Sequence, residues 1–275
     1  MDPFVPSAER LLEFLTGEFE RGLAYSTLNC ARSAIALITG PALQTDPLVQ
    51  RFFRGIANIR PPGPKYNLTW DPQLVLKYFQ DQPPTDRLTI EALAKKLVTL
   101  LALTTGHRLQ TLAKIRLPNI KASPTQINIF IPDRIKTSCP GRTQPMLVLP
   151  FYSDPQICAA KTLQRYLAIT ASSRGNIDYL FLSLNLPLHP VTTQTLSRWV
   201  KAILQESGIN SNFTAHSARH ASTSAALRGG ASADSILKAA GWTASSTVFA
   251  TFYSRPLVDE AGDFAHAVLR RSKEL

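Results

Sequence analysis

Residues 213–230 have the sequence FTAHSARHASTSAALRGG, which places His216 and Arg219 three positions apart at the start of a predicted helix. Side chains at this spacing lie on one face of a helix. The helix N-terminus adds a partial positive charge, and a guanidinium can bind two oxygens of a phosphate while keeping its own charge. The pattern therefore predicts a helix whose first turn binds a phosphate group.

A second informative stretch, AAGWTASSTVFATFYSRP, covers residues 239–256. Ser245 or Ser246 is expected to cap a short helix that presents Tyr253. The residues that this helix is expected to bury are Val248, Phe249 and Phe252. A tyrosine hydroxyl can act as a nucleophile and form a covalent intermediate.

Two further cations lie upstream. The segment LALTTGHRLQTLAKIRL (residues 101–117) is expected to end a buried helix at Gly106 and to expose Arg108. Lys136 lies in the turn-rich basic stretch PDRIKTSCPGRTQP (residues 132–145), where Arg134 is a rival for the same role. Breaking a phosphodiester without a metal requires cations for the developing charge, a nucleophile and a general acid, and these residue types supply all three.

In chain order, these residues resemble the tyrosine recombinase (phage integrase) family. The resemblance spans roughly residues 68–256, and in detail it is similar to recombinases of eukaryotic mobile elements of the DIRS, Ngaro and Crypton type. It implies a mainly α fold with a small β-sheet, in which a helical core-binding domain precedes an α+β catalytic domain. The motifs that carry it are Arg108 in TGHRLQTL, Lys136 in a β-hairpin turn, HSAR at His216–Arg219, Gly241-Trp242, and Tyr253.

The resemblance also implies a reaction. Arg108 and Arg219 would clamp the scissile phosphate of double-stranded DNA, and Tyr253 would attack it to form a covalent 3′-phosphotyrosine. The phosphotyrosine keeps the energy of the broken bond, so another 5′-hydroxyl could reseal the strand with no ATP, metal or other cofactor. Eleven residues separate Trp242 from Tyr253, and this spacing leaves open whether the tyrosine acts in its own subunit or in a neighbour's.

The remaining site residues receive supporting roles from the same resemblance. Lys136 would protonate the leaving 5′-hydroxyl, and His216 would act as a hydrogen-bonding general base or acid. Trp242 would pack against the site and donate its indole N–H. One position departs from the family pattern, because Thr111 stands where an acidic residue is common.

The chain is expected to divide into a helical DNA-binding domain at residues 1–62 and a catalytic domain at residues 68–275. The sequence RPPGPKYN at Arg60–Asn67 cannot continue a helix and is the best linker candidate. In the first domain, Ser7 and Ser26 are expected to cap two helices. The first helix is expected to carry Leu11, Leu12 and Leu15 on one face. The second is expected to have a buried stripe of Leu28, Ala31, Ala34, Ile35 and Ile38. A third helix is expected at Pro47–Ile59.

In the second domain, the apolar spacing predicts an amphipathic helix at Ile90–Thr104. Alternation at residues 127–131 predicts an edge or half-buried strand, and residues 146–149 predict a second. Later helices are expected at Pro155–Ser172, Thr193–Gly208, Ser217–Gly229, Ser232–Ala240 and Ser245–Tyr253.

Thirty Lys and Arg against 19 Asp and Glu give a net charge of +11, which favours a polyanionic partner such as nucleic acid. The predicted DNA-binding residues are Arg51, Arg54, Arg60, Lys65, Arg134, Arg142, Arg198 and Lys201. Three widely spaced cysteines favour neither a disulfide framework nor a zinc site, and no membrane segment or partner membrane is expected. We expect a soluble intracellular protein, nuclear if it is eukaryotic.

The predicted function is site-specific recombination in the integration or excision of a mobile element, by a dimer on each site and a synaptic tetramer. Residues 263–275, with Phe264, Val268 and Leu269 at helical spacing, are expected to dock on a neighbouring protomer. Two alternatives share the fold, namely a domesticated DNA-binding protein that no longer cuts and an enzyme similar to type IB topoisomerases. A metal-dependent nuclease would need clustered carboxylates, which the sequence does not suggest.

Overall fold

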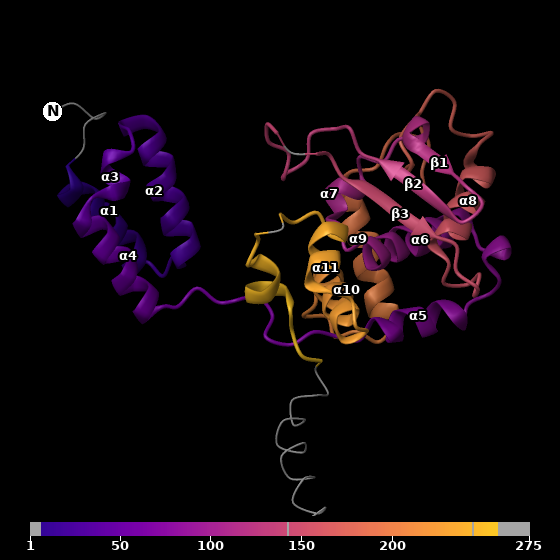
Figure 1. Ribbon diagram of the computed structural model, residues 1–275. Helices are drawn as coiled ribbons and strands as arrows, with labels where there is room; N and C mark the ends of the chain where they lie inside the picture. The colour runs from indigo at the N-terminus through magenta and orange to yellow at the C-terminus, as the bar shows by residue number, and fades with distance from the viewer. Residues whose placement is uncertain (1–6, 142, 244, 258–275) are drawn as a thin grey trace, which may run out of the picture. The chain divides into compact units, whose positions relative to one another are not determined.

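The computed structural model describes residues 7–141, 143–243 and 245–257 (Figure 1). The chain forms two compact units, Met1–Lys65 and Tyr66–Leu275, and each has its own hydrophobic core. Of the helices within the described ranges, none combines the length and the apolar character that crossing a bilayer requires.

The described part of the first unit is helical, and polar caps begin two of its helices. The Oγ of Ser7 accepts the N–H of Arg10 at 3.4 Å, as predicted, and Asp46 accepts the N–H groups of Leu48 at 2.8 Å and Val49 at 3.3 Å. The elements are α1 (Ala8–Glu20), α2 (Tyr25–Thr39), α3 (Ala42–Thr45) and α4 (Pro47–Ile59). They enclose a small core of Leu11, Leu15, Leu28, Val49, Phe53 and Ile56.

Two predictions about α2 are wrong. Ser26 is not its cap, because the extended backbone of Ala24 already begins the helix and Ser26 lies within the first turn. The expected buried stripe is also shorter, since only Leu28 is fully buried and Ile38 is 66% exposed. The core of this small unit covers the start of α2 and leaves its far end in solvent.

The second unit contains the remaining elements. Its helices are α5 (Pro72–Gln80), η1 (Thr85–Arg87), α6 (Ile90–Thr105), α7 (Leu109–Leu112), η2 (Leu117–Asn119), α8 (Ala159–Thr170), α9 (Thr193–Glu206), α10 (Ser217–Arg228), α11 (Ala233–Ala239) and η3 (Phe249–Tyr253). The predicted helices in this unit are thus present with shifted ends, except that η3 is a short π-helix rather than the α-helix expected at Ser245–Tyr253.

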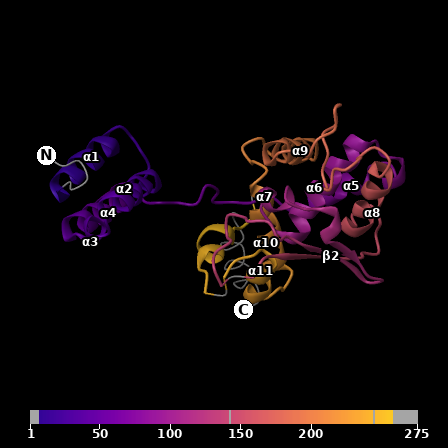
Figure 2. The same cartoon turned by 90° about the horizontal axis from the view of Figure 1, so that it is seen from above.

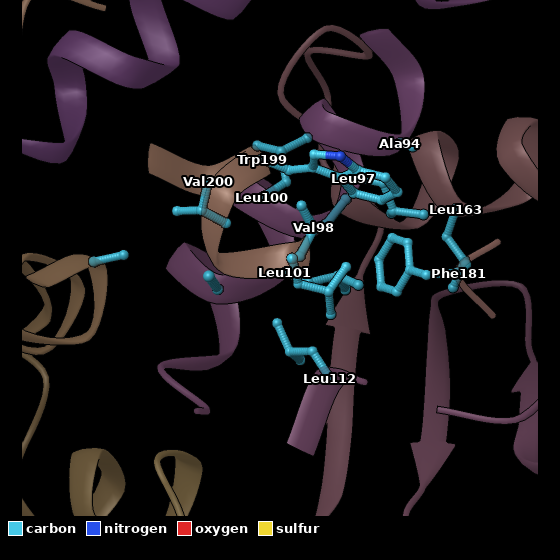
Figure 3. Close-up of a cluster of buried hydrophobic side chains, with 14 of the residues drawn as sticks. Ala94, Leu97, Val98, Leu100, Leu101, Leu112, Leu163, Phe181, Trp199 and Val200 are labelled. Carbon is cyan, nitrogen blue, oxygen red and sulfur yellow. The ribbon is translucent and has the colours of Figure 1, made fainter. Parts of the chain in front are cut away.

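Helix α6 is the centre of the larger core. The predicted apolar face is fully buried at Leu93, Leu97, Leu100 and Leu101, and it packs against α8, α9 and α10. Figure 3 shows Leu97, Leu100 and Leu101 gathered with Trp199 of α9 and Leu163 of α8. Because α6 is covered on nearly all sides, its C-terminal end is fixed within the core.

A three-stranded antiparallel sheet covers part of this core. The strands are β1 (Ile120–Ala122), β2 (Gln126–Phe130) and β3 (Met146–Pro150), in the order β1-β2-β3. Ile127 and Ile129 of β2 pair with Leu149 and Leu147 of β3, and all four side chains face the core. In Figure 2 the strands and α9 lie on opposite sides of α6. The predicted fold class, mainly helical with a small sheet, is confirmed, although β1 was not predicted.

Candidate active site

The first turn of α10 carries His216 and Arg219. His216 is the residue before the helix, and its exposed ring places Nε2 3.0 Å from the Oη of Tyr253. The start of α10 is fixed by Ser217, whose buried Oγ accepts the indole N–H of Trp70 at 2.8 Å and donates to the carbonyl of Thr214 at 2.7 Å. The spacing in HSAR therefore places the two side chains as predicted, while the anchoring by Trp70 was not predicted.

Arg219 is buried, with 2% of its surface exposed. Its Nη1 donates to the carbonyls of Gly106 and, at 2.8 Å, of Ala240, and its guanidinium lies 3.7 Å from the ring centre of Trp242. Within the described residues, its buried Nε and Nη2 have no hydrogen-bond partner. Burial and then the charge of Arg108 lower the pKa of Arg219, so a bound anion would relieve both effects. The guanidinium of Arg219 thus uses Nη1 to bind the protein backbone, and its Nε and Nη2 are left to donate to a ligand.

The end of α6 places Arg108 near Arg219. The helix ends at Gly106 in the left-handed conformation (φ 60°), where a Cβ would lie 3.4 Å from side-chain atoms of Ala240 and Thr223. Arg108 follows, half-buried, and its charge reaches both Arg219 and His107. Arg108 was expected to be exposed at the helix end and is only partly so. Its charge is close enough to Arg219 to lower the pKa of that residue.

Trp242 packs against Arg219, and the backbone of the preceding residue, Gly241, closely approaches the ring of His107. Gly241 has a positive φ of 69°, and a Cβ there would lie 3.0 Å from Cε1 of His107. His107 is buried, and burial followed by the charges of Arg219 and Arg108 lowers its pKa to about 4, so the ring is neutral near pH 7. The indole Nε1 of Trp242 is buried and has no hydrogen-bond partner among the described residues. Trp242 therefore adds a third unused donor, on the ring against which the guanidinium of Arg219 packs.

Tyr253 is the last residue of η3, in which the N–H of Ser254 donates to the carbonyl of Phe249 at 2.9 Å. Single π-helical turns of this kind are frequent at functional sites. The ring of Tyr253 is 8% exposed and packs at 4.9 Å from Trp242, with the guanidinium of Arg219 5.5 Å from its centre.

The expected packing of this segment needs correction. Phe249 is buried as predicted, but Val248 and Phe252 are 38% and 36% exposed, because the wider π turn rotates them outward and Tyr253 inward. Ser246 accepts the N–H of Val248 at 3.3 Å, yet η3 itself begins without a side-chain cap. Tyr253 is consequently held inside the site rather than presented on the surface.

Lys136 lies apart from the residues that meet at the start of α10. It is exposed on the connection between β2 and β3, and it forms no hydrogen bond or ion pair with the described residues. Its neighbours Ile135 and Thr137 line a cavity of about 900 Å³ that His107 and Trp242 also line. The connection therefore borders the site, and Arg134, which is also exposed there, stays a rival.

Sequence reasoning did not identify His220 as a residue of the site. Its ring is stacked on Tyr253 with ring centres 4.1 Å apart, and its edge lies toward His216. The available signal was its position four residues after His216, on the same face of α10. Thr111, at the position where the family commonly has an acid, is buried in α7.

The predicted DNA-binding residues are spread over both units and stay predictions. Arg60 is exposed but engaged within its own unit, because its guanidinium donates to the carbonyls of Leu23 at 3.0 Å and Phe19 at 3.2 Å. Exposed side chains are also found at Arg51, Arg54, Lys65, Arg134, Arg198 and Lys201. Arg142 lies outside the described residues, as do Phe264, Val268 and Leu269 of the expected docking segment. In the described ranges, no three His, Cys, Asp or Glu side chains are grouped as metal ligands would be.

Comparison with known proteins gives the chain its family. Three solved structures share its fold: XerH recombinase bound to its palindromic difH substrate (TM-score 0.62, 14% identity, 94% of this chain and 72% of that one), the Tn1549 transposon integrase with circular intermediate DNA (0.60, 14%, 96% and 86%), and XerA recombinase (0.52, 15%, 97% and 84%). No curated protein sequence matches the chain. The phage integrase family pattern matches residues 84–257, which include all six predicted catalytic residues. The chain belongs to the phage integrase family and is a tyrosine recombinase.

Proposed function

We propose that this recombinase cleaves and rejoins double-stranded DNA through a covalent 3′-phosphotyrosine at Tyr253, without metal or ATP. The observation that carries the proposal is the contact between the Oη of Tyr253 and Nε2 of His216 at 3.0 Å, beside the two unused donors of Arg219. A nucleophile, a proton acceptor and a phosphate-binding cation thus meet on one side of α10.

The cleavage step begins at the tyrosine. In it, Oη forms a bond to phosphorus while the bond from phosphorus to the 5′-oxygen breaks, and the phenolic proton moves to an unprotonated His216 Nε2. The phosphorane-like transition state carries more negative charge than the diester, and fixed donors aimed at that charge lower the barrier. In our proposal, Arg108, the free Nε and Nη2 of Arg219 and the free indole N–H of Trp242 are these donors.

The leaving 5′-oxygen needs a proton, and we assign its delivery to Lys136. The cavity between the β2–β3 connection and Trp242 leaves room for a DNA strand beside the site, so closing of this connection on DNA would bring the ammonium group to the leaving oxygen. The phosphotyrosine conserves the bond energy, and a 5′-hydroxyl that attacks it reverses the same steps. No external energy source is needed for joining.

The position of Tyr253 favours cleavage in the tyrosine's own subunit. Its ring is buried against Trp242, His220 and Arg219 of the same chain, and its hydroxyl bonds to the same chain's His216. Transfer to a neighbour would require all of these contacts to be broken. We therefore propose action in cis.

The biological setting proposed here follows from the sequence resemblance to eukaryotic mobile-element recombinases. We assign the protein to integration or excision of such an element in the nucleus, with a dimer on each DNA site and a synaptic tetramer. A net charge of +11 supports a DNA partner, and the exposed cations of both units are the proposed phosphate contacts. The rival functions are a non-cleaving DNA-binding protein and a topoisomerase of type IB.

The test uses a nicked suicide substrate that lets the cleaved end diffuse away, made from the termini of the source element. Wild type and Tyr253→Phe are incubated with it in EDTA, and protein–DNA adducts that resist denaturation are counted. An adduct with wild type alone supports the proposal, and an adduct with Tyr253→Phe moves the nucleophile elsewhere. Binding without any adduct favours the non-cleaving rival. Relaxation of a supercoiled plasmid that lacks these termini favours the topoisomerase.

A further inference from the structure

We propose that His220 and Ser224 are positioning residues that together hold Tyr253 for attack, an inference that rests on the proposed role of Tyr253 as the nucleophile. His216, His220 and Ser224 follow one another at intervals of four residues on α10, so their side chains share one face of the helix. His216 contacts the tyrosine hydroxyl, His220 its ring, and Ser224 its backbone.

His220 supports the flat face of the tyrosine. Its ring lies 4.1 Å from the ring of Tyr253 at an interplanar angle of 20°, while Tyr66 and His216 pack edge-on against it at 5.4 Å and 5.7 Å. Tyr66 is in turn fixed by its hydroxyl, which lies 2.9 Å from Oγ1 of Thr214. The imidazole is therefore packed between Tyr66 and His216, and one of its faces stacks on the tyrosine.

The protonation state of His220 suits this stacking role. Burial, followed by the charges of His216, Arg255 and Arg219, lowers its pKa to about 4, so the ring is neutral at physiological pH. Its ring also lies within hydrogen-bonding reach of the Phe252 carbonyl, one residue before the nucleophile. It thus restrains both the side chain and the backbone of this segment.

Packing alone does not account for a histidine at this place. Its Nδ1 is buried and has no hydrogen-bond partner among the described residues, which costs free energy. An apolar ring of similar size would fill the same space without that cost. The backbone of Phe252, which lies close enough to raise the pKa of the imidazole and adjoins the nucleophile, gives a reason for a histidine here.

Ser224 restrains the other side of the nucleophile's backbone. Its hydroxyl is buried, donates to the carbonyl of Tyr253 at 2.7 Å and accepts the N–H of Arg255 at 3.0 Å. One side chain therefore bridges the residues on both sides of Ser254. This matters because η3 is a single π turn, in which the bond from Ser254 N–H to the Phe249 carbonyl closes the end that carries Tyr253, and Ser224 adds a second restraint there.

The consequence for the reaction is geometric. The reacting oxygen lies at the end of a long side chain, and a displacement of about 1 Å in an enzyme site can cost roughly 100-fold in rate. His220 and Ser224 touch neither the phosphate nor the leaving group in this proposal, so their loss affects only reactions that use the tyrosine.

Two reactions on the same full-length chain separate positioning from phosphate binding. The first is formation of the covalent adduct with the suicide substrate, which requires Tyr253. The second is joining by the Tyr253→Phe chain of an oligonucleotide that ends in a 3′-(4-nitrophenyl) phosphate. There a 5′-hydroxyl oxygen bonds to phosphorus, 4-nitrophenolate leaves with the electron pair of its bond, and the hydroxyl proton passes to His216. The coloured 4-nitrophenolate is measured directly.

We expect His220→Ala and Ser224→Ala each to slow adduct formation by roughly 10- to 100-fold. The same substitutions, added to Tyr253→Phe, leave joining within about twofold of the Tyr253→Phe parent, because the phosphate donors are intact. Ser224→Thr keeps the hydroxyl and restores adduct formation. Ser222→Ala is the matched control, since Ser222 on the same helix donates only to the carbonyl of Arg219, and it behaves as wild type.

The outcomes separate this proposal from the one on which it rests. If wild type forms no adduct, the proposed function fails and this inference fails with it. If wild type forms the adduct and both alanine variants form it at the wild-type rate, the positioning roles alone are overturned. They are also overturned if joining falls as far as adduct formation, because the residues would then support the whole site. Thermal unfolding and DNA binding of each variant identify a loss caused by misfolding.

Discussion

In the catalytic unit, the residues that meet at α10 and the lysine of the β2–β3 connection are held in different ways. Arg219 and Tyr253 are buried, and several hydrogen bonds and ring contacts fix each of them. Lys136 is exposed and forms no hydrogen bond or ion pair with the described residues. The residues around Tyr253 are therefore assembled in the chain without DNA, while Lys136, the proposed proton donor, is not brought to them.

This difference indicates which interactions DNA must supply. The proposed phosphate donors of Arg219 are already fixed by burial and hydrogen bonds, so in our proposal DNA binding there costs little reorganisation, as transition-state stabilisation by fixed dipoles requires. The connection that carries Lys136 borders an open cavity of about 900 Å³ and must approach the leaving oxygen. We infer that attack is preorganised and that protonation of the leaving group depends on closing of the β2–β3 connection. Substitutions on the two sides should separate these contributions, with the largest effect at the phosphate donors.

The largest effect is expected at Arg219. Arg219→Ala removes a fixed cation from the transition state, and losses of this kind reach at least roughly 1,000-fold. Arg219→Lys keeps the charge but loses the planar fork, so it restores only a small part of the rate. Adduct formation with the suicide substrate measures both variants, and DNA binding measured separately shows that substrate is still bound. A rate within tenfold of wild type in Arg219→Ala would contradict a preorganised phosphate site.

A large but reversible effect is expected at Lys136. Lys136→Ala removes the proposed general acid, a loss typically of about 100- to 10,000-fold. A substrate with sulfur in place of the bridging 5′-oxygen needs no proton on its leaving group, so it restores cleavage in this variant. Arg134→Ala is the matched control, because Arg134 is exposed on the same connection. If the sulfur-containing substrate restores cleavage in Arg134→Ala and not in Lys136→Ala, then Arg134 is the general acid.

The α10 side of the site is also expected to be acid-sensitive. Burial lowers the pKa of both His107 and His220 to about 4, so the unfolded chain binds their protons more readily than the folded chain does. Their contribution to stability is therefore complete above about pH 6.5 and is lost as the pH falls toward 4. The free energy of unfolding should fall on the order of 3 kcal/mol per histidine over this range.

Denaturant titrations across that pH range measure this loss. His107→Phe and His220→Phe should each remove part of the slope, whatever they do to stability at neutral pH. The β2–β3 connection contains no histidine, so it serves as a local control. Its rate of cleavage by a protease that cuts next to uncharged residues should not change over the same pH range. A stability curve that is flat from pH 6.5 to 4 would show that these rings are not held neutral.

The sequence predicted these two sides of the site unequally, for physical reasons. Helical periodicity and local spacing determine the face shared by His216 and Arg219, and the apolar residues of α6, so these predictions are confirmed. The π turn of η3 depends on how Tyr253 packs against residues more than thirty positions away, which no local pattern records. The packing of His220 and the anchoring of α10 by Trp70 were missed for the same reason.

Smaller predictions failed where little burial enforces a pattern. Strand β1 has three residues and one ladder partner, too short for alternation to identify it. Ser26 can form a cap in principle, but the extended backbone at Ala24 fixes the start of α2 two residues earlier. The position of Lys136 relative to the phosphate could not follow from sequence, because the connection has few contacts that define it.

The smallest effect is expected at the base of that connection. Asp133 lies three residues before Lys136, and its carboxylate accepts from Nε and Nη2 of Arg116 at 3.2 Å and 3.3 Å. Arg116 also donates to Asp178 at 3.0 Å and to the hydroxyl of Tyr179 at 2.8 Å, so it ties the connection to the body of the unit. Asp133→Asn should loosen the connection and slow cleavage of the normal substrate by roughly threefold to tenfold.

The sulfur-containing substrate decides how Asp133 acts. If Asp133 only helps to deliver Lys136, Asp133→Asn should cleave that substrate at the wild-type rate, and adding Asp133→Asn to Lys136→Ala should cause no further loss on the normal substrate. A loss on the sulfur substrate as well would mean that Asp133 supports the tyrosine side, and the two sides would then not be independent. The double-variant cycle gives this coupling directly, since contributions from independent residues add and those from residues in one chain of interactions do not.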